Sequence, residues 1–102
     1  MSDNIFLSVI IPVLNNCVGF TRAITSIIQQ PNRHTIEIIV IDGGSIDGTV
    51  EEIKRFGEFI SYWETGIDVG ICDAFNRGIN QASGYLIAIL NSDDYWMDNT
   101  LD

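Results

Sequence analysis

The chain has 102 residues, 46% of them hydrophobic, which is enough for one small domain that buries roughly two thirds of its unfolded surface. Its net charge is −9 and its five Lys and Arg residues form no cluster, so we expect no nucleic-acid partner. No apolar run reaches the roughly 18 residues of a membrane span, and the start lacks the basic region of a signal peptide. We expect one cytoplasmic domain, with membrane association only through sequence outside these residues.

Three short runs are rich in β-branched residues and almost continuously apolar, which is the pattern of strands buried on both faces of a parallel sheet. These runs are Leu7–Pro12, Ile36–Ile41 and Tyr85–Leu90. Phe59–Trp63 is a weaker candidate for a further strand, between the last two runs.

Helical patterns alternate with these strands. Apolar residues at three- and four-residue spacing predict a first helix over Phe20–Ile28. A short second helix is expected over Thr49–Gly57, where Thr49 and Glu52 have the spacing of a capping box. Ile71–Ala82 has the clearest helical stripe. The order βαβαβαβ predicts an α/β, Rossmann-like half-domain with three layers and a mostly parallel sheet.

Polar residues follow three of the predicted strands, at the edge where open α/β sheets bind ligands. They are Asn15-Asn16, Asp42–Ser45 with Asp47 close behind, and Asn91–Asp94. Each cluster taken alone is more simply a turn or a helix cap. Adjacent carboxylates at Asp93 and Asp94, however, repel each other unless they are solvated or share a cation. The sharper interpretation is a site for Mn²⁺ or Mg²⁺.

Other nucleotide-binding folds fit the sequence poorly. Neither G-x-G-x-x-G nor G-x-x-x-x-G-K-[ST] is present, which disfavours NAD enzymes and P-loop NTPases. A receiver-type phosphoacceptor domain would carry its acidic pair after the first strand, where this chain has Asn15 and Asn16.

Four stretches occur in the chain in a recognisable order, namely Ser8–Asn16, Ile39–Thr49, Gly70–Gly78 and Leu90–Trp96. On these stretches, the sequence resembles family-two glycosyltransferases of the GT-A type. The resemblance implies that residues 1–102 are the nucleotide-diphospho-sugar-binding part of a metal-dependent, inverting glycosyltransferase of the hexosyltransferase kind. The donor would be a nucleoside diphosphate sugar, most readily a UDP-sugar, and the acceptor a glycan or glycoconjugate in polysaccharide assembly.

The resemblance also implies roles for individual residues. Asp93 ends the D-x-D-like Asn91-Ser92-Asp93 and would ligate the metal, with Asp94 supporting it through water or facing the sugar. Asp42 would accept the imide N–H of uracil. The other donor contacts would come from Pro12, Asn15, Gly44, Arg77, Asn91 and Ser92. For Arg77, a solvated helix position is an equal alternative to a diphosphate contact.

Two residues depart from the family's pattern. Asn91 replaces the usual first Asp and lowers the negative charge of the metal site. Val69 stands where relatives often place Lys, which removes a contact to phosphate.

No catalytic base is expected within the chain. Inverting transfer requires a carboxylate that takes the proton of the acceptor hydroxyl, and in this family it lies on a later segment, beyond residue 102. We therefore expect a truncated, donor-binding half-domain, and an apolar sheet edge left uncovered would favour a homodimer. The alternative is a non-catalytic nucleotide-binding or interaction module that keeps the fold without turnover.

Overall fold

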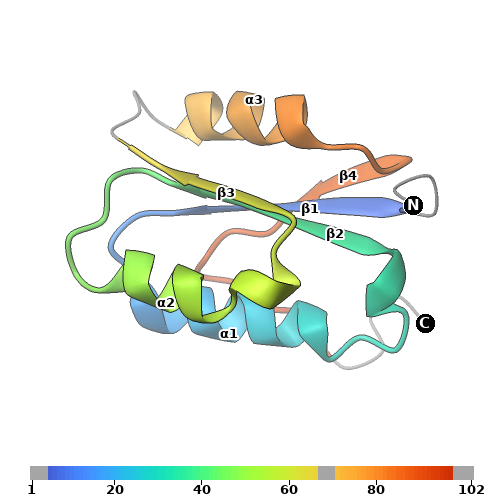
Figure 1. The fold of residues 1–102 in the computed structure, drawn as a ribbon, viewed down its shortest axis with the longest axis horizontal. Helices are drawn as coiled ribbons and strands as arrows, with labels where there is room; N and C mark the ends of the chain where they lie inside the picture. Colours follow the sequence, from blue (N-terminus) through green and yellow to red (C-terminus); the bar gives the residue numbers. More distant parts are fainter. Residues whose placement is uncertain (1–4, 67–70, 98–102) are drawn as a thin grey trace.

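The computed structural model describes residues 5–66 and 71–97, which form three layers around a parallel sheet (Figure 1). Helix α3 (Ile71–Gln81) covers one face of the sheet, and α1 (Cys17–Ile28) and α2 (Thr49–Arg55) cover the other. The strands are β1 (Leu7–Val13), β2 (Ile36–Asp42), β3 (Tyr62–Thr65) and β4 (Leu86–Ile89), in the order β3-β2-β1-β4. The predicted Rossmann-like α/β architecture is confirmed. In the part of the chain described, no helix is both long and apolar enough to cross a membrane.

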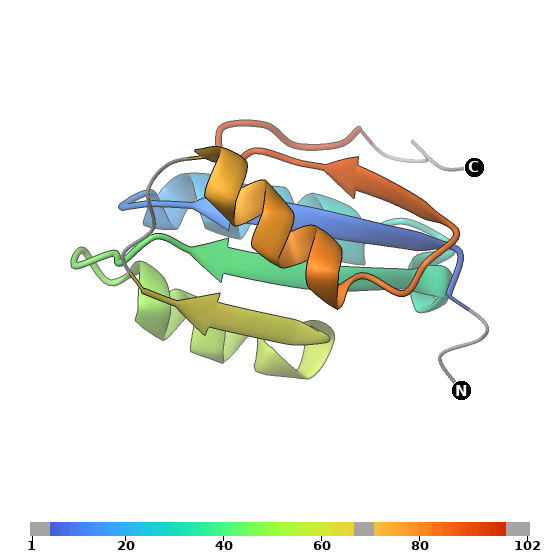
Figure 2. The ribbon, with the colours of Figure 1, turned by 90° about the horizontal axis from the view of Figure 1, so that it is seen from above.

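Strand β1 is the centre of the sheet. It pairs with β2 over its whole length, from Leu7 opposite Ile36 to Val13 opposite Asp42. On its other edge, Leu7 to Ile10 pair with β4. All of these pairs are parallel, so the carboxyl ends of the strands point the same way (Figure 2). The loops that follow β1, β2 and β4 therefore meet at one edge.

Alternating side chains of β1 and β2 build two hydrophobic cores. The larger core lies on the side of α1 and α2. Its fully buried members are Val9, Ile11, Phe20, Ala23, Ile24, Ile27, Val40 and Ile53. The smaller core, toward α3, contains Ile10, Ile39, Ile41 and Ala74. Because both faces of β1 are covered, its backbone and the residues directly after it are held firmly.

The third strand begins later than its sequence pattern predicts. The strand expected over Phe59–Trp63 is instead Tyr62–Thr65. A short 3-10 helix, η3, spans Gly57–Phe59, and Ile60 closes it by donating its N–H to the Gly57 carbonyl at 3.2 Å. The local turn therefore takes up the residues that the pattern assigned to the start of the strand.

The last strand is not buried on both faces, which corrects the prediction for Tyr85–Leu90. Leu86, Ile87 and Ile89 are all exposed. Strand β4 is last in the sheet order, and among the described residues it pairs with β1 alone. An apolar run looks the same in an edge strand as in a central one, so its burial depends on neighbours that the run does not specify.

The predicted capping box at the start of α2 is also wrong. Gly48, with φ of 100°, is the N-cap, and Thr49 is already the first helical residue. Asp47 Oδ1 accepts hydrogen bonds from the N–H of Thr49, at 3.0 Å, and from its hydroxyl. Glu52 turns away and accepts a hydrogen bond of 2.7 Å from the Thr21 hydroxyl. Glu52 therefore links α2 to α1 instead of closing the end of its own helix.

This link makes part of the stability pH-dependent. Hydrogen bonds from Arg55 and then from Thr21 hold the pKa of Glu52 below its ordinary value of 4.5. A carboxyl group with a lowered folded-state pKa stabilises the fold fully above the unfolded pKa, and this stabilisation is lost as the pH falls through the folded value. We expect Glu52→Gln to unfold at lower urea concentration than the wild type at neutral pH, and the two midpoints to converge below pH 4.5. Glu51→Gln, at an exposed neighbouring position, is the control. A gap between the curves that is constant with pH would contradict the assignment.

Helix α3 approaches the sheet closely at Gly78. A Cβ atom there would lie 2.5 Å from Ile10 Cγ2 and 2.9 Å from Ile10 Cδ1, and Ile10 is fully buried. We expect Gly78→Ala to lower the free energy of unfolding, because overpacking costs about 1–3 kcal/mol and alanine's helix preference returns only about 1 kcal/mol. Gly57→Ala is the control, since nothing lies within 4 Å of its Cβ position. Urea unfolding measures both, and an unchanged midpoint for Gly78→Ala would contradict tight packing of α3.

Candidate functional site

Two consecutive asparagines after β1 join the loops that follow β2 and β4. The Asn15 N–H donates to Ser45 Oγ at 2.8 Å, and Asn15 Oδ1 accepts from the Ile46 N–H at 2.8 Å. Asn16 Nδ2 donates to Asp93 Oδ1 at 2.9 Å. The three polar clusters that the sequence places after separate strands are thus linked through Asn15 and Asn16.

A pocket of about 400 Å³ opens beside these loops at the carboxyl edge of the sheet. Its lining comprises Pro12, Val13, Leu14, Ile41, Gly43, Ala74, Asn91, Ser92, Asp93 and Asp94. The pocket therefore has an apolar wall from β1, β2 and α3, and a polar wall from the loop after β4. Five of the residues expected to bind donor or metal are in this lining, namely Pro12, Asn91, Ser92, Asp93 and Asp94.

Asp42 is fully buried and organises the loop after β2. Its Oδ2 accepts hydrogen bonds from the N–H groups of Gly44, at 3.1 Å, and Ser45, at 2.9 Å, and from the Thr65 hydroxyl at 2.6 Å. Its Oδ1 accepts from the Ser45 hydroxyl. Gly44, with φ of 100°, has a left-handed backbone that favours glycine. Asp42 thus shapes the loop that carries Gly43 to the pocket, while its contact with a base stays a prediction.

Arg77 is held by two carboxylates. Its NH1 lies 3.0 Å from Glu64 Oε2 on β3, and its Nε lies 3.2 Å from Asp73 Oδ2 one turn earlier on α3. Glu64 also accepts a hydrogen bond of 2.8 Å from the Tyr62 hydroxyl, and this bond, helped by burial, raises the pKa of Tyr62. Arg77 does not line the pocket. Its contact with a diphosphate stays a prediction, and the ion pairs by themselves account for its position.

The adjacent aspartates are exposed at the rim of the pocket. The Asp94 N–H donates to the Asn91 carbonyl at 2.9 Å and closes a turn. Within residues 5–66 and 71–97, no three His, Cys, Asp or Glu side chains gather closely enough to hold a metal. Carboxylate oxygens suit Mn²⁺ and Mg²⁺, so Asp93 and Asp94 fit as part of a metal site whose remaining ligands would be diphosphate oxygens and water.

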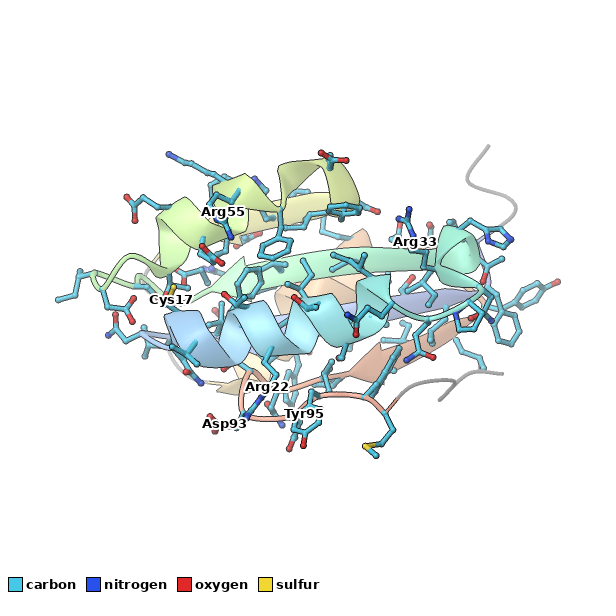
Figure 3. The ribbon with its side chains drawn as sticks, turned by 90° about the horizontal axis from the view of Figure 1, so that it is seen from below. Cys17, Arg22, Arg33, Arg55, Asp93 and Tyr95 are labelled. Carbon is cyan, nitrogen blue, oxygen red and sulfur yellow. The ribbon has the colours of Figure 1, made fainter. Side chains whose placement is uncertain are left out.

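Two residues of α1 contact this loop without having been predicted. Arg22 donates to the Asp93 carbonyl at 3.1 Å, and its guanidinium carbon lies 4.7 Å from the centroid of the Tyr95 ring. Figure 3 shows Arg22, Asp93 and Tyr95 gathered on the same side of α1. Gly19 lies so close to the Ser92 carbonyl oxygen that a Cβ atom would overlap it. The sequence does contain a signal for this face of the helix. Asn16, Gly19 and Arg22 follow one another at three-residue intervals, which places them on the same side of α1.

A larger hollow of about 640 Å³ lies along the outer side of α1, beside Tyr95–Met97. Its lining is mostly apolar and includes none of the carboxylates that follow the strands. The smaller pocket, which is lined by Asn91–Asp94 and lies beside the other two polar loops, is therefore the candidate site.

Solved structures with the same arrangement are glycosyltransferases of GT-A type. Mannosyltransferase PcManGT from Pyrobaculum calidifontis, in complex with GDP-Man and Mn²⁺, superimposes with a TM-score of 0.83 at 24% identity, over 91% of this chain and 29% of that one. S. aureus TarS 1-349 in complex with UDP-GlcNAc gives a TM-score of 0.84 at 23% identity, over 95% of this chain and 29% of that one. At these identities the likeness shows the fold alone, which is the GT-A fold.

The sequence comparisons identify the family. An uncharacterized glycosyltransferase of Mycobacterium tuberculosis is 41% identical over 88 residues, which cover 86% of this chain and 34% of that protein. The chain thus spans about a third of the length of this relative. Residues 8–102 match the model of the family Glycosyl transferase family 2, and with the GT-A arrangement of strands and polar loops this shows that the chain belongs to that family.

Proposed function

We propose that the chain binds the nucleoside diphosphate part of a sugar donor, most readily a UDP-sugar, in the 400 Å³ pocket at the carboxyl edge of the sheet. The observation that carries the proposal is that three polar loops are joined beside this pocket, and that the loop after β4 forms its polar wall. Asn15 joins the β1 and β2 loops, and Asn16 joins the β1 and β4 loops. A pocket with one apolar wall and one polar wall suits a flat base next to a charged diphosphate.

The charges around the pocket support a divalent cation between protein and diphosphate. The chain carries a net charge of −9, and Asp93 and Asp94 lie at the rim of the pocket. Within the described residues, the nearby arginines already have partners: Arg22 binds the Asp93 carbonyl, and Arg77 lies between two carboxylates. A bare diphosphate would therefore meet mainly negative charge. A metal on Asp93, with Asp94 in support, would remove this repulsion and stabilise the charge that develops on the leaving diphosphate.

The choice of uracil depends on Asp42. The solved structures with this fold bind both GDP-Man and UDP-GlcNAc, so the fold alone does not select the base. Ile41 and Gly43, the neighbours of Asp42, line the pocket. A carboxylate between these two lining residues would favour a base with an imide N–H, as in uracil or thymine. It would disfavour cytosine, whose N3 is a hydrogen-bond acceptor. One of the four hydrogen bonds to Asp42 would have to be shared or released to admit the base.

Membership of the family supports a proposal for the wider activity. We propose that the chain is the donor-binding part of an inverting, metal-dependent hexosyltransferase that acts on a glycan or glycoconjugate. The carboxylate base would lie in sequence after residue 102, since the strand-end carboxylates described here are assigned to the donor and to the loops. The alternative is a module that keeps the fold and binds nucleotide without turnover.

The first prediction concerns the metal. We expect calorimetric titration to detect UDP binding in the presence of Mn²⁺, and binding at least about tenfold weaker in its absence, because one lost charge-assisted contact costs about 1.5–3 kcal/mol. Asp93→Asn should reduce the affinity with Mn²⁺ to nearly the metal-free value. Glu58→Gln removes an exposed carboxylate on η3 and serves as the control.

The titrations test the donor site, and only an assay of sugar transfer separates an enzyme from a module that binds nucleotide without turnover. Metal-dependent binding that Asp93→Asn abolishes supports the donor site, and activity with an acceptor is then sought in the longer protein. A folded chain that binds none of UDP, dTDP, GDP and CDP, with or without Mn²⁺, contradicts the proposal for this chain. The same titration of a version extended beyond residue 102 then tests whether further sequence completes the site.

The second prediction concerns the base. If Asp42 accepts the imide N–H, Asp42→Asn should reduce the preference for UDP over CDP about tenfold, since mismatched polar groups cost about 1–3 kcal/mol. Thr65→Val is the matched control, because it removes one donor to Asp42 and loosens the loop without changing the carboxylate. Equal losses of UDP and CDP affinity in both variants would show that Asp42 acts only by holding the loop.

A further inference from the structure

We infer that Asn16 is a positioning residue that aims the Asp93 carboxylate at the metal, an inference that rests on the proposed function. Asn16 Nδ2 lies 2.9 Å from Asp93 Oδ1, 3.3 Å from Ser92 Oγ and 3.5 Å from the Ser92 carbonyl oxygen. One amide group thus contacts the last two residues of the D-x-D-like Asn91-Ser92-Asp93. It reaches them from a position more than 70 residues earlier in the chain.

The orientation of this amide is fixed by the helix that it begins. Asn16 is the N-cap of α1, and its Oδ1 accepts a hydrogen bond of 3.0 Å from the Gly19 N–H. A backbone N–H needs an acceptor, so the oxygen of the amide must face Gly19. The NH₂ group then has to point the other way, toward Ser92 and Asp93. Capping of the helix therefore determines that Asn16 presents its hydrogen-bond-donating NH₂ group to the loop after β4.

A neutral donor holds the carboxylate without cancelling its charge. The nearest guanidinium, on Arg22, binds the backbone carbonyl of Asp93 and not its carboxylate. Among the described residues, no hydrogen bond reaches Asp93 Oδ2. Asn16 thus fixes one carboxylate oxygen while the group keeps its full negative charge and a free oxygen for a cation. A lysine or arginine in the same place would compete with the metal.

Helix α1 gives this contact a rigid base. Its inner face is formed by Phe20, Ala23, Ile24 and Ile27, each with an exposed fraction of 0%. The N-terminal half of the same helix contacts the loop at Gly19 and Arg22. Because the helix cannot shift without disturbing the larger core, the loop is located relative to β1 by packing as well as by hydrogen bonds.

The variant Asn16→Ser separates the two roles of this side chain, which are to cap α1 through Oδ1 and to donate a hydrogen bond to Asp93 through Nδ2. Serine caps helices about as well as asparagine, but its hydroxyl is attached closer to the backbone and cannot extend to Asp93. We expect the urea midpoint to fall only slightly, because the lost hydrogen bond is exposed. The dissociation constant for UDP with Mn²⁺ should rise about 3- to 10-fold, which corresponds to loss of one hydrogen bond. The control is Asn80→Ser, the same exchange at an exposed position of α3, which should change neither quantity.

A second measurement follows the metal alone. Broadening of backbone NMR signals near residue 93 by Mn²⁺ should require more metal in Asn16→Ser than in the wild type. If the wild type binds Mn²⁺ and UDP, and Asn16→Ser binds both equally well, the role of Asn16 is refuted while the proposed function stands. If the wild type binds neither, the metal site and the role of Asn16 are refuted together. A fall in the urea midpoint of Asn16→Ser with unchanged metal binding would show that Asn16 has only a structural role.

Discussion

Parallel pairing of β1 with strands on both of its edges is the constraint on which the rest of the structure depends. Val13, the last residue of β1, lies opposite Asp42, the last residue of β2, and Ile10 lies opposite Ile89, the last residue of β4. Whatever follows β1 must therefore emerge between the other two loops. Asn15 and Asn16 occupy that place, and each contacts one neighbouring loop. The site is thus a consequence of strand register before any side chain chemistry is considered.

The order of the strands and helices, and the edge at which the polar loops meet, followed from the sequence. Apolar runs such as Ile36–Ile41 and the stripe in α1 report the period of their own backbone, and strand ends in a parallel sheet must converge. Helix α2 begins at Thr49, as predicted, but its capping box was predicted wrongly, because the partners of capping residues depend on more than local spacing. Thr49 and Glu52 have capping-box spacing, but Asp47 bonds Thr49 first, and Glu52 finds a partner in Thr21, which lies 31 positions away.

The partners of the site residues could not be predicted from local pattern. Asp42 is bound by Thr65, which lies 23 positions later, and Arg77 by Glu64, which lies 13 positions earlier on β3. Such contacts depend on how strands and helices are placed in three dimensions, and residue type alone allows many partners for a carboxylate or a guanidinium. The exposure of Leu86 and Ile87 has the same origin, because burial belongs to the neighbours of a strand and not to its own sequence.

The backbone of Asn15 restricts which residues this position can accept. Its φ is 48°, in the left-handed region that only glycine, asparagine and aspartate adopt readily. Glycine would leave the Ile46 N–H without the oxygen that Asn15 supplies. Aspartate would supply that oxygen, but would add a negative charge to an edge that already carries Asp42, Asp93 and Asp94. Every substitution at position 15 therefore carries a cost in backbone strain, in a lost hydrogen bond or in added negative charge, even before any ligand binds.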